Sequence, residues 1–323
     1  LGRANPGRMM ENSLVRKRSG QDSSQGTRAT RSRRRALVAT YGVASRSALI
    51  TWSSVERNVI SPLQADGFSV TVVSFDLRIG GSRIDGVDAC RSSDVVRCNV
   101  CEVDEQARLD VELAHKMEEF RLREPRSYCL FSICKSQWAH RQYTGTGMSC
   151  FNNSLRQLYM ENRVAAHLKS HGAQYDVAVA LSVDYYVATP IRLQHVHEAA
   201  SATASSNSTV YVTSVNDSGG YTDGFYIGLP STLARVMARF IDSFDIVLTG
   251  HSAESYERLL KSAFLARGVL RRTTPLVFFK VRASCHVVWQ DVDALFGRPH
   301  PERFSRVGDG SAIEVTRTIE LYV

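Results

Sequence analysis

The chain has 323 residues, 43% of them hydrophobic, and a formal net charge of +8. This composition suits one large globular domain, and no apolar stretch reaches the roughly 18–20 residues that a membrane-spanning helix needs. Seven cysteines are an odd number in a long chain, which argues against a disulfide framework. Cys98 and Cys101 have no further ligands at the spacing of a zinc site, so loop or strand positions are favoured over metal binding.

The positive charge is concentrated at the N-terminus. Residues 1–35 contain ten Lys or Arg and two acids, so the whole excess of +8 lies there. This segment is almost without apolar residues, which predicts a disordered basic tail followed by a single folded domain over residues 36–323. A domain with balanced charge does not attract a polyanion, and no nucleic-acid partner is expected for it.

The first predicted elements form a β-α-β unit. A short apolar run over residues 36–40 predicts a buried strand that leads to a turn at Gly42. Apolar residues at helical spacing predict a helix over 45–63. Residues 69–75 are dense in β-branched side chains and predict a second strand, which ends at Asp76.

Strands and helices continue to alternate along the chain. Further helices are predicted over 104–123, 152–170, 231–240 and 252–267, and further strands over 95–98, 127–134, 175–181, 209–215 and 275–281. Residues 199–208, rich in Ala, Ser and Thr, predict a loop. The alternation predicts an α/β fold with a mostly parallel, Rossmann-like sheet flanked by helices.

Three residues stand where such a sheet binds ligands, beyond the carboxyl ends of its strands: Gly42, Asp76 and Asp184. Gly42 and Arg46 together are candidates for holding a diphosphate. Asp184 follows a continuous apolar run, and a carboxylate there can hold Mg²⁺ or Mn²⁺, whose other ligands are phosphate oxygens and water. Asp76 is a candidate for contacting a nucleobase or ribose. Asp184 is equally explained as a residue that caps a turn or a helix, and for Asp76 a plain turn residue is the favoured interpretation.

Two further positions are candidates for the same pocket. Arg156 and Gln157 lie next to each other on a predicted helix, where they either reach the pocket or lie on a solvated face. Asp223 lies in a loop rich in turn residues and is a candidate general base that deprotonates an acceptor hydroxyl.

Five segments carry a resemblance to a known family. They are residues 36–63 with Gly42, Arg46, Ser54 and Asn58; Val70–Asp76; Asn153–Leu158 with Arg156 and Gln157; Tyr175–Asp184 with the Pro190-Ile191 that follows; and Thr222–Pro230. In this order they resemble the GT-A-fold nucleotide-sugar glycosyltransferases of large algal viruses, algae and protists. Residues 253–254 and 281–283 are similar to the closing Glu and Arg positions of that family.

The resemblance implies metal-assisted transfer of a sugar from a nucleotide-diphosphate donor to a hydroxyl of a glycan or glycoprotein. It implies that Asp184 binds Mn²⁺ or Mg²⁺ and that Arg46 and Asp76 lie near the nucleotide. It also implies that Arg156 helps to hold the nucleotide, and that Asp223 lies near the acceptor as the catalytic residue.

Two other hypotheses remain open. Ser182 stands where the family's Asp-x-Asp-like element begins with an acid, and Thr222 replaces the usual Asn, as in an inactive relative that binds a glycan or a partner. Alternatively, the tail over 1–35 binds nucleic acid or a membrane surface and the domain is a passenger. The sequence does not choose between the cytoplasm and the secretory pathway.

Overall fold

The structure is a computed structural model, which describes residues 33–78, 96–123, 147–202, 208–213, 220–240 and 256–281. The chain divides into two units, Leu1–Ser32 and Arg33–Val323, and all described residues belong to the second. The predicted disorder of the tail and the predicted strand over 127–134 lie outside the described residues.

A seven-stranded sheet forms the centre of the second unit, in the order β3-β2-β1-β4-β7-β6-β8. Strand β7 runs antiparallel to its neighbours β4 and β6, and the other pairs are parallel. A second sheet pairs β5 with β9 in antiparallel register. The strands are β1 (Arg35–Gly42), β2 (Ser69–Arg78), β3 (Val100–Glu105), β4 (Val177–Ser182), β5 (Tyr185–Val187), β6 (Thr209–Val212), β7 (Phe225–Gly228), β8 (Leu270–Thr273) and β9 (Phe278–Lys280).

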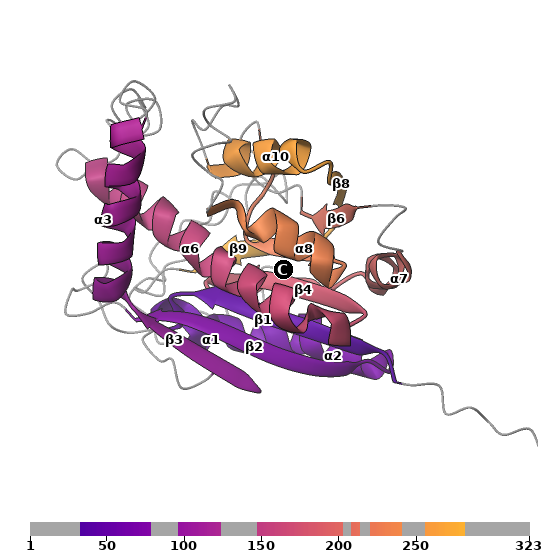
Figure 1. The fold of residues 1–323 in the computed structure, drawn as a ribbon. Helices are drawn as coiled ribbons and strands as arrows, with labels where there is room; N and C mark the ends of the chain where they lie inside the picture. The colour runs from indigo at the N-terminus through magenta and orange to yellow at the C-terminus, as the bar shows by residue number, and fades with distance from the viewer. Residues whose placement is uncertain are drawn as a thin grey trace, which may run out of the picture. The chain divides into compact units, whose positions relative to one another are not determined.

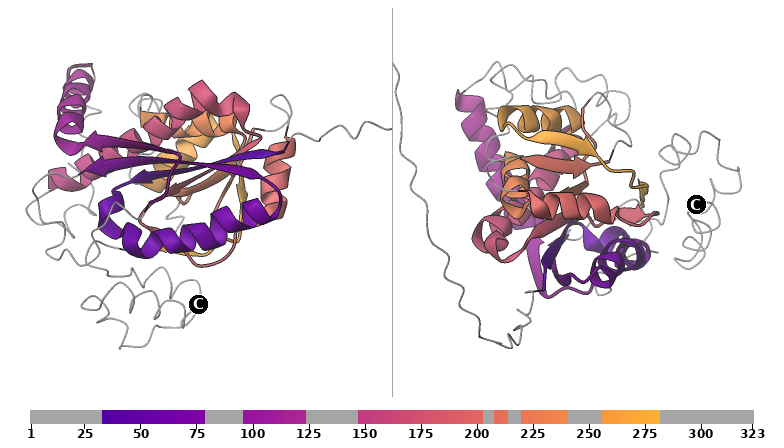
Figure 2. Two further views of the ribbon diagram at one scale, coloured as in Figure 1. Left: turned by 90° about the horizontal axis from the view of Figure 1, so that it is seen from below. Right: turned by 90° about the vertical axis from the view of Figure 1, so that its right-hand side faces the viewer.

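Helices cover both faces of the large sheet, which confirms the predicted α/β class. Helices α6 and α8 lie on one face, whereas α1 and α2 lie on the other (Figures 1 and 2). Most of the buried apolar residues form two large clusters, one on each face of the sheet: the first includes residues of α6, α8 and α10, and the second includes residues of α1, α2 and α7. The helical segments are α1 (Ala44–Val55), the π-helical turn η1 (Glu56–Ile60), α2 (Ser61–Ala65), α3 (Gln106–Arg123), α6 (Gly147–His171), the 3-10 turn η2 (Gly172–Gln174), α7 (Leu193–Ser201), α8 (Pro230–Met237) and α10 (Tyr256–Ala266).

The central strands β1 and β4 were predicted correctly because both of their faces are buried. In β1, Leu37 belongs to one apolar cluster and Val38 to the other, because successive side chains of a strand point to opposite faces. Every residue of β4 is buried, as expected for a strand covered on both faces.

Several predicted elements differ from the observed ones. Strand β3 covers 100–105 rather than 95–98, because its half-exposed residues carry little apolar pattern. The helix predicted over 45–63 is observed over residues 44–65, with Pro62 three residues before its end, but it contains a π-helical turn that the sequence did not predict. The loop predicted over 199–208 begins inside α7, a helix that the sequence did not predict.

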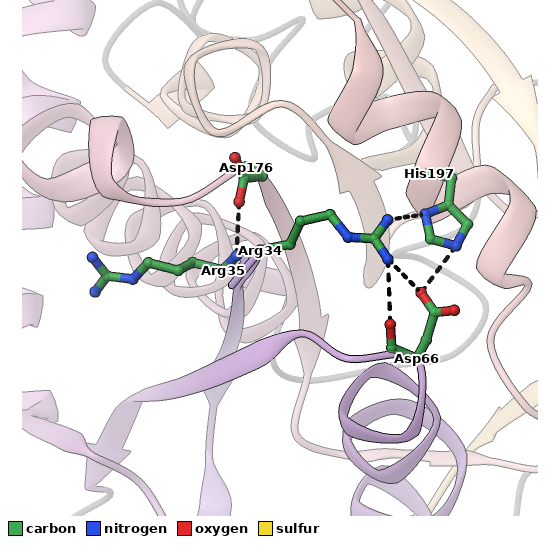
Figure 3. Close-up of polar contacts among 5 residues, drawn as sticks. All are labelled: Arg34, Arg35, Asp66, Asp176 and His197. Carbon is green, nitrogen blue, oxygen red and sulfur yellow. Dashed lines mark hydrogen bonds and ion pairs between the residues drawn. The ribbon is translucent and has the colours of Figure 1, made fainter. Parts of the chain in front are cut away.

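A polar cluster joins four elements at the N-terminal end of β1 (Figure 3). The guanidinium of Arg34 donates to His197 Nδ1 at 2.6 Å and lies 3.4 Å from a carboxylate oxygen of Asp66. His197 Nε2 lies 2.9 Å from the same Asp66 oxygen, and the backbone N–H of Arg35 donates to Asp176 at 2.7 Å. These contacts fasten α7, the end of α2 and the residue before β4 to the start of β1.

A second polar cluster is fully buried beneath the opposite end of the sheet. Glu161 on α6 and Arg239, which follows α8, are both 0% exposed, and their charged atoms lie 2.5 Å apart. The hydroxyl of Tyr41 donates to Glu161 at 3.2 Å, and the hydroxyl of Tyr226 lies 3.5 Å from Glu161 and 3.4 Å from Arg239. Burial raises the pKa of the Tyr226 hydroxyl, which therefore stays protonated.

Replacing Glu161 by Gln is expected to lower the free energy of unfolding by about 3–5 kcal/mol, because it removes the carboxylate charge that faces the buried guanidinium of Arg239. The double variant E161Q/R239M should lose less than the sum of the two single losses. Urea denaturation followed by circular dichroism measures both.

The matched control is Glu112→Gln on α3, whose partner Arg108 lies 3.7 Å away on the surface. That change should cost less than about 1 kcal/mol. Equal losses in E161Q and E112Q would contradict the role given to the buried pair.

Candidate functional site

The candidate site lies where the sheet reverses its order. Strand β1 is flanked by β2 on one side and by β4 on the other, so the chain leaves β1 in one direction and later returns to its other side. Ligands of open α/β sheets bind outside the carboxyl ends of the strands at such a switch point. Gly42 ends β1, and Asp184 follows the end of β4 by two residues.

Gly42 brings the backbone of β1 close to the turn that carries Asp184. Its φ is +122°, a conformation that residues with a side chain rarely adopt. The backbone N–H of Val183 donates to the carbonyl of Tyr41 at 3.0 Å, which extends the pairing of β1 and β4 by one residue. The end of β1 and the Asp184 turn are therefore held side by side.

Asp184 lies in the short turn between β4 and β5, and its carboxylate accepts a hydrogen bond from the Ser182 hydroxyl at 2.6 Å. Thr51 of α1 fixes this turn, because its hydroxyl donates to the carbonyl of Val183 at 2.6 Å. The backbone N–H of Val281 donates to the carbonyl of Asp184 at 2.9 Å. The Asp184 backbone is thus fixed from α1 and from the end of β9.

Two polar residues of α1 and η1 hold the strand that follows Asp184. The hydroxyl of Ser54 accepts the backbone N–H of Val187 at 2.9 Å, and the amide of Asn58 donates to the carbonyl of Val187 at 2.7 Å. Both residues belong to the resemblance described above, but no role was predicted for them. In the structure they position β5.

Asp76 caps the helix that begins after β1. It lies inside β2, two residues before the strand ends, and its register partner is Gly42. Its carboxylate accepts the backbone N–H of Ala44, the first residue of α1, at 2.8 Å. Burial raises the pKa of the Asp76 carboxyl, while this hydrogen bond and the charge of Arg78 act in the opposite direction. Arg46 lies in the first turn of α1, and its side chain is outside the described part of the structure.

Asp223 reaches the same edge from the start of β7. Its side chain is 5% exposed, and its Oδ2 atom accepts a hydrogen bond from Gln157 of α6 at 2.6 Å. The next residue, Gly224, accepts the backbone N–H of Ser182 through its carbonyl at 2.9 Å. Asp223 therefore lies beside the end of β4, one strand away from Gly42.

Arg156 makes a different contact from the one predicted. Its guanidinium pairs with the carboxylate of Asp110 on α3 through two hydrogen bonds of 2.9 Å each. Gln157, rather than Arg156, is the residue of this pair that contacts Asp223. The role of Arg156 in holding a nucleotide remains a prediction.

The donor atoms at this edge are oxygens. Carboxylate and hydroxyl oxygens of Asp184 and Ser182 suit a hard cation such as Mg²⁺ or Mn²⁺. Among the described residues, no group of three or more His, Cys, Asp or Glu side chains gathers as in a preformed metal site. A cation at Asp184 would thus depend on a ligand's phosphate oxygens for further coordination.

Cys98 and Cys101 lie at the start of β3 and not at this edge. They form a disulfide with Cα atoms 5.7 Å apart. None of the helices in the described ranges is both long and apolar enough to cross a membrane.

Comparisons with known proteins do not place the chain in a family. No protein-family model matches it, and no curated protein matches it. Its function is therefore inferred from the chemistry of the switch-point edge.

Replacing Gly224 by Ala should destabilise the fold far more than replacing Gly67 by Ala. Both glycines have nearly the same φ, +89° and +88°, so both changes cost backbone strain of about 1–2 kcal/mol. A Cβ atom at position 224 would lie 1.8 Å from the ring of Tyr185, whereas position 67 has open space. Overpacking should add about 1–3 kcal/mol to the loss in G224A.

Urea denaturation measures the loss in the free energy of unfolding for each variant. The difference between the two losses reports the overpacking, because the backbone strain is similar in both. Equal losses would mean that the contact between Gly224 and Tyr185, the residue after Asp184, does not constrain the site.

Proposed function

We propose that the chain is a GT-A-fold glycosyltransferase, which moves a sugar from a nucleotide-diphosphate donor to a hydroxyl of a glycan or glycoprotein acceptor. The observation that carries the proposal is the position of Asp184. Asp184 lies two residues beyond a central buried strand, at the switch point, in the turn whose backbone is bonded to the end of β1.

The donor diphosphate is expected between Gly42, Asp184 and the start of α1. Helix α1 begins at Ala44, directly after the end of β1, so its positive dipole end and its first backbone N–H groups lie at this edge. Asp184, assisted by Ser182, would hold Mn²⁺ or Mg²⁺. When bound, such a cation neutralises the negative charge that develops on the departing nucleotide diphosphate.

Asp223 is the residue proposed to accept the proton of the acceptor hydroxyl. The hydrogen bond from Gln157 fixes the orientation of the Asp223 carboxylate. A carboxylate held in one orientation beside the end of β4 would be able to take the proton of an acceptor hydroxyl that binds there.

A second candidate function is that of an inactive relative that binds glycans or a partner. The observation that favours it is the hydrogen bond from Ser182 to Asp184, since the family's element has an acid at position 182. Ion binding at Asp184 distinguishes the two, because only the transferase needs it.

A thermal-shift panel of nucleoside diphosphates and nucleotide sugars, with and without Mn²⁺, tests the proposal. At a ligand concentration of about 100 times Kd, native-state binding adds about 2.7 kcal/mol, which corresponds to a rise in Tm of about 5 °C for a domain of this size. The rise should require Mn²⁺, disappear in Asp184→Asn and persist in the surface control Glu112→Gln.

Two results would count against the proposal. If no nucleotide shifts the Tm of the folded wild type, the inactive relative becomes the better account. If the Mn²⁺-dependent shift persists in D184N, Asp184 is not the metal ligand.

A further inference from the structure

A polar cavity that is largely open to solvent shares no residue with the switch-point edge. It has a volume of about 500 Å³, within the range of small-molecule sites. Its lining comes from one helix and two neighbouring strands at the β8 end of the sheet: His195, Glu198, Tyr211, Arg271, Arg272 and Thr273.

An acid, a hydroxyl and a guanidinium meet in this cavity. The hydroxyl of Tyr211 donates to the carboxylate of Glu198, and the guanidinium of Arg272 lies 3.4 Å from that carboxylate and 3.4 Å from the Tyr211 oxygen. The ring of His195 stacks on Tyr211 with centroids 4.6 Å apart, and its Nδ1 atom is 3.0 Å from the hydroxyl of Thr274. The cavity therefore presents both hydrogen-bond donors and acceptors.

The charges of these groups are fixed at neutral pH. The hydrogen bond from Tyr211, followed by one from Gln194, lowers the pKa of the Glu198 carboxyl, which is therefore ionised. Burial lowers the pKa of His195, which is therefore neutral. A carboxylate faces a guanidinium, with uncharged imidazole and phenol groups beside them.

This arrangement selects against most classes of ligand. Glu198 repels an anion, and Arg272 beside it repels a cation. An apolar ligand would remove water from charged groups without replacing their hydrogen bonds. Neighbouring sugar hydroxyls both donate and accept, and they match a carboxylate beside a guanidinium.

We propose that this cavity binds a neutral sugar unit of an oligosaccharide and serves as the acceptor-side subsite of the transferase. The second half of this statement rests on the function proposed above. The sugar site itself stands on the cavity alone.

One segment of chain connects the cavity to Asp184. Arg272 lies in β8, and the chain continues through β9, which pairs with β5, to Val281, whose backbone N–H bonds to Asp184. The nine residues from Arg272 to Val281 span at most about 30 Å. The cavity therefore lies no more than about 30 Å from Asp184, which sets the greatest length that an oligosaccharide bound at both places would need.

Calorimetric titration of the full chain with neutral trisaccharides of glucose, galactose and mannose tests the proposal, without nucleotide or metal. At least one should bind saturably, and Glu198→Ala and Arg272→Met should each weaken it at least tenfold. The matched surface variants Glu112→Ala and Arg108→Met on α3 should bind as the wild type does. Glucuronic acid and inorganic phosphate form the anionic arm and should bind more weakly.

The proposal is overturned if no neutral trisaccharide binds, if both cavity variants bind it normally, or if phosphate or glucuronic acid binds more tightly. Its failure is distinguishable from that of the transferase. Sugar binding lost in E198A but intact in D184N, with no nucleotide shift, supports the cavity and rejects the transferase. A nucleotide shift without sugar binding does the reverse.

Discussion

The buried ion pair between Glu161 and Arg239 is the constraint on which the switch-point edge depends. Its two charges are completely buried, and such a pair gains little stability over apolar residues of the same volume. Its consequence is geometric, because Tyr41 and Tyr226 both direct their hydroxyls to Glu161. Tyr41 also accepts the Val183 N–H through its carbonyl, so the same residue joins the buried pair to the Asp184 turn.

The helix that follows β1 holds the edge from the other face. Thr51, Ser54 and Asn58 are spaced three and four residues apart, which places them on one side of the helix. Thr51 bonds to the backbone of Val183, the residue before Asp184. Ser54 and Asn58 bond to the backbone of Val187, three residues after Asp184. Asp76 in turn caps the first residue of this helix. The candidate site is thus built on rigid elements from both layers.

The sequence predicted the parts of the fold that are buried on two faces. Strands β1, β2 and β4 consist of apolar or β-branched runs, and each is predicted within three residues of its observed ends. Strand β3 and helix α7 were not predicted in place, because partly exposed elements carry a mixed pattern. At the β8 end, the cavity gave no signal, because its residues come from three separate elements.

At the candidate site, residue types were predicted better than contacts. Gly42, Asp76, Asp184 and Asp223 do gather at one edge, since the ends of the parallel strands β1, β2 and β4 meet there with the start of the antiparallel strand β7. Arg156 and Gln157 are neighbours on a helix and point about 100° apart, so only one of them faces Asp223. Glu161 was not singled out, because a charged residue in a helical sequence is usually exposed.

The most direct test of the account is paramagnetic broadening in the amide NMR spectrum when Mn²⁺ and a nucleoside diphosphate are added together. Gly42 and Gly224 lie at the switch-point edge, whereas Gly67 and Gly268 precede β2 and β8 and lie at the opposite edge. The account predicts that the signals of Gly42 and Gly224 broaden and that those of Gly67 and Gly268 remain sharp. Broadening that begins at Gly67 or Gly268, or none at all, would contradict it.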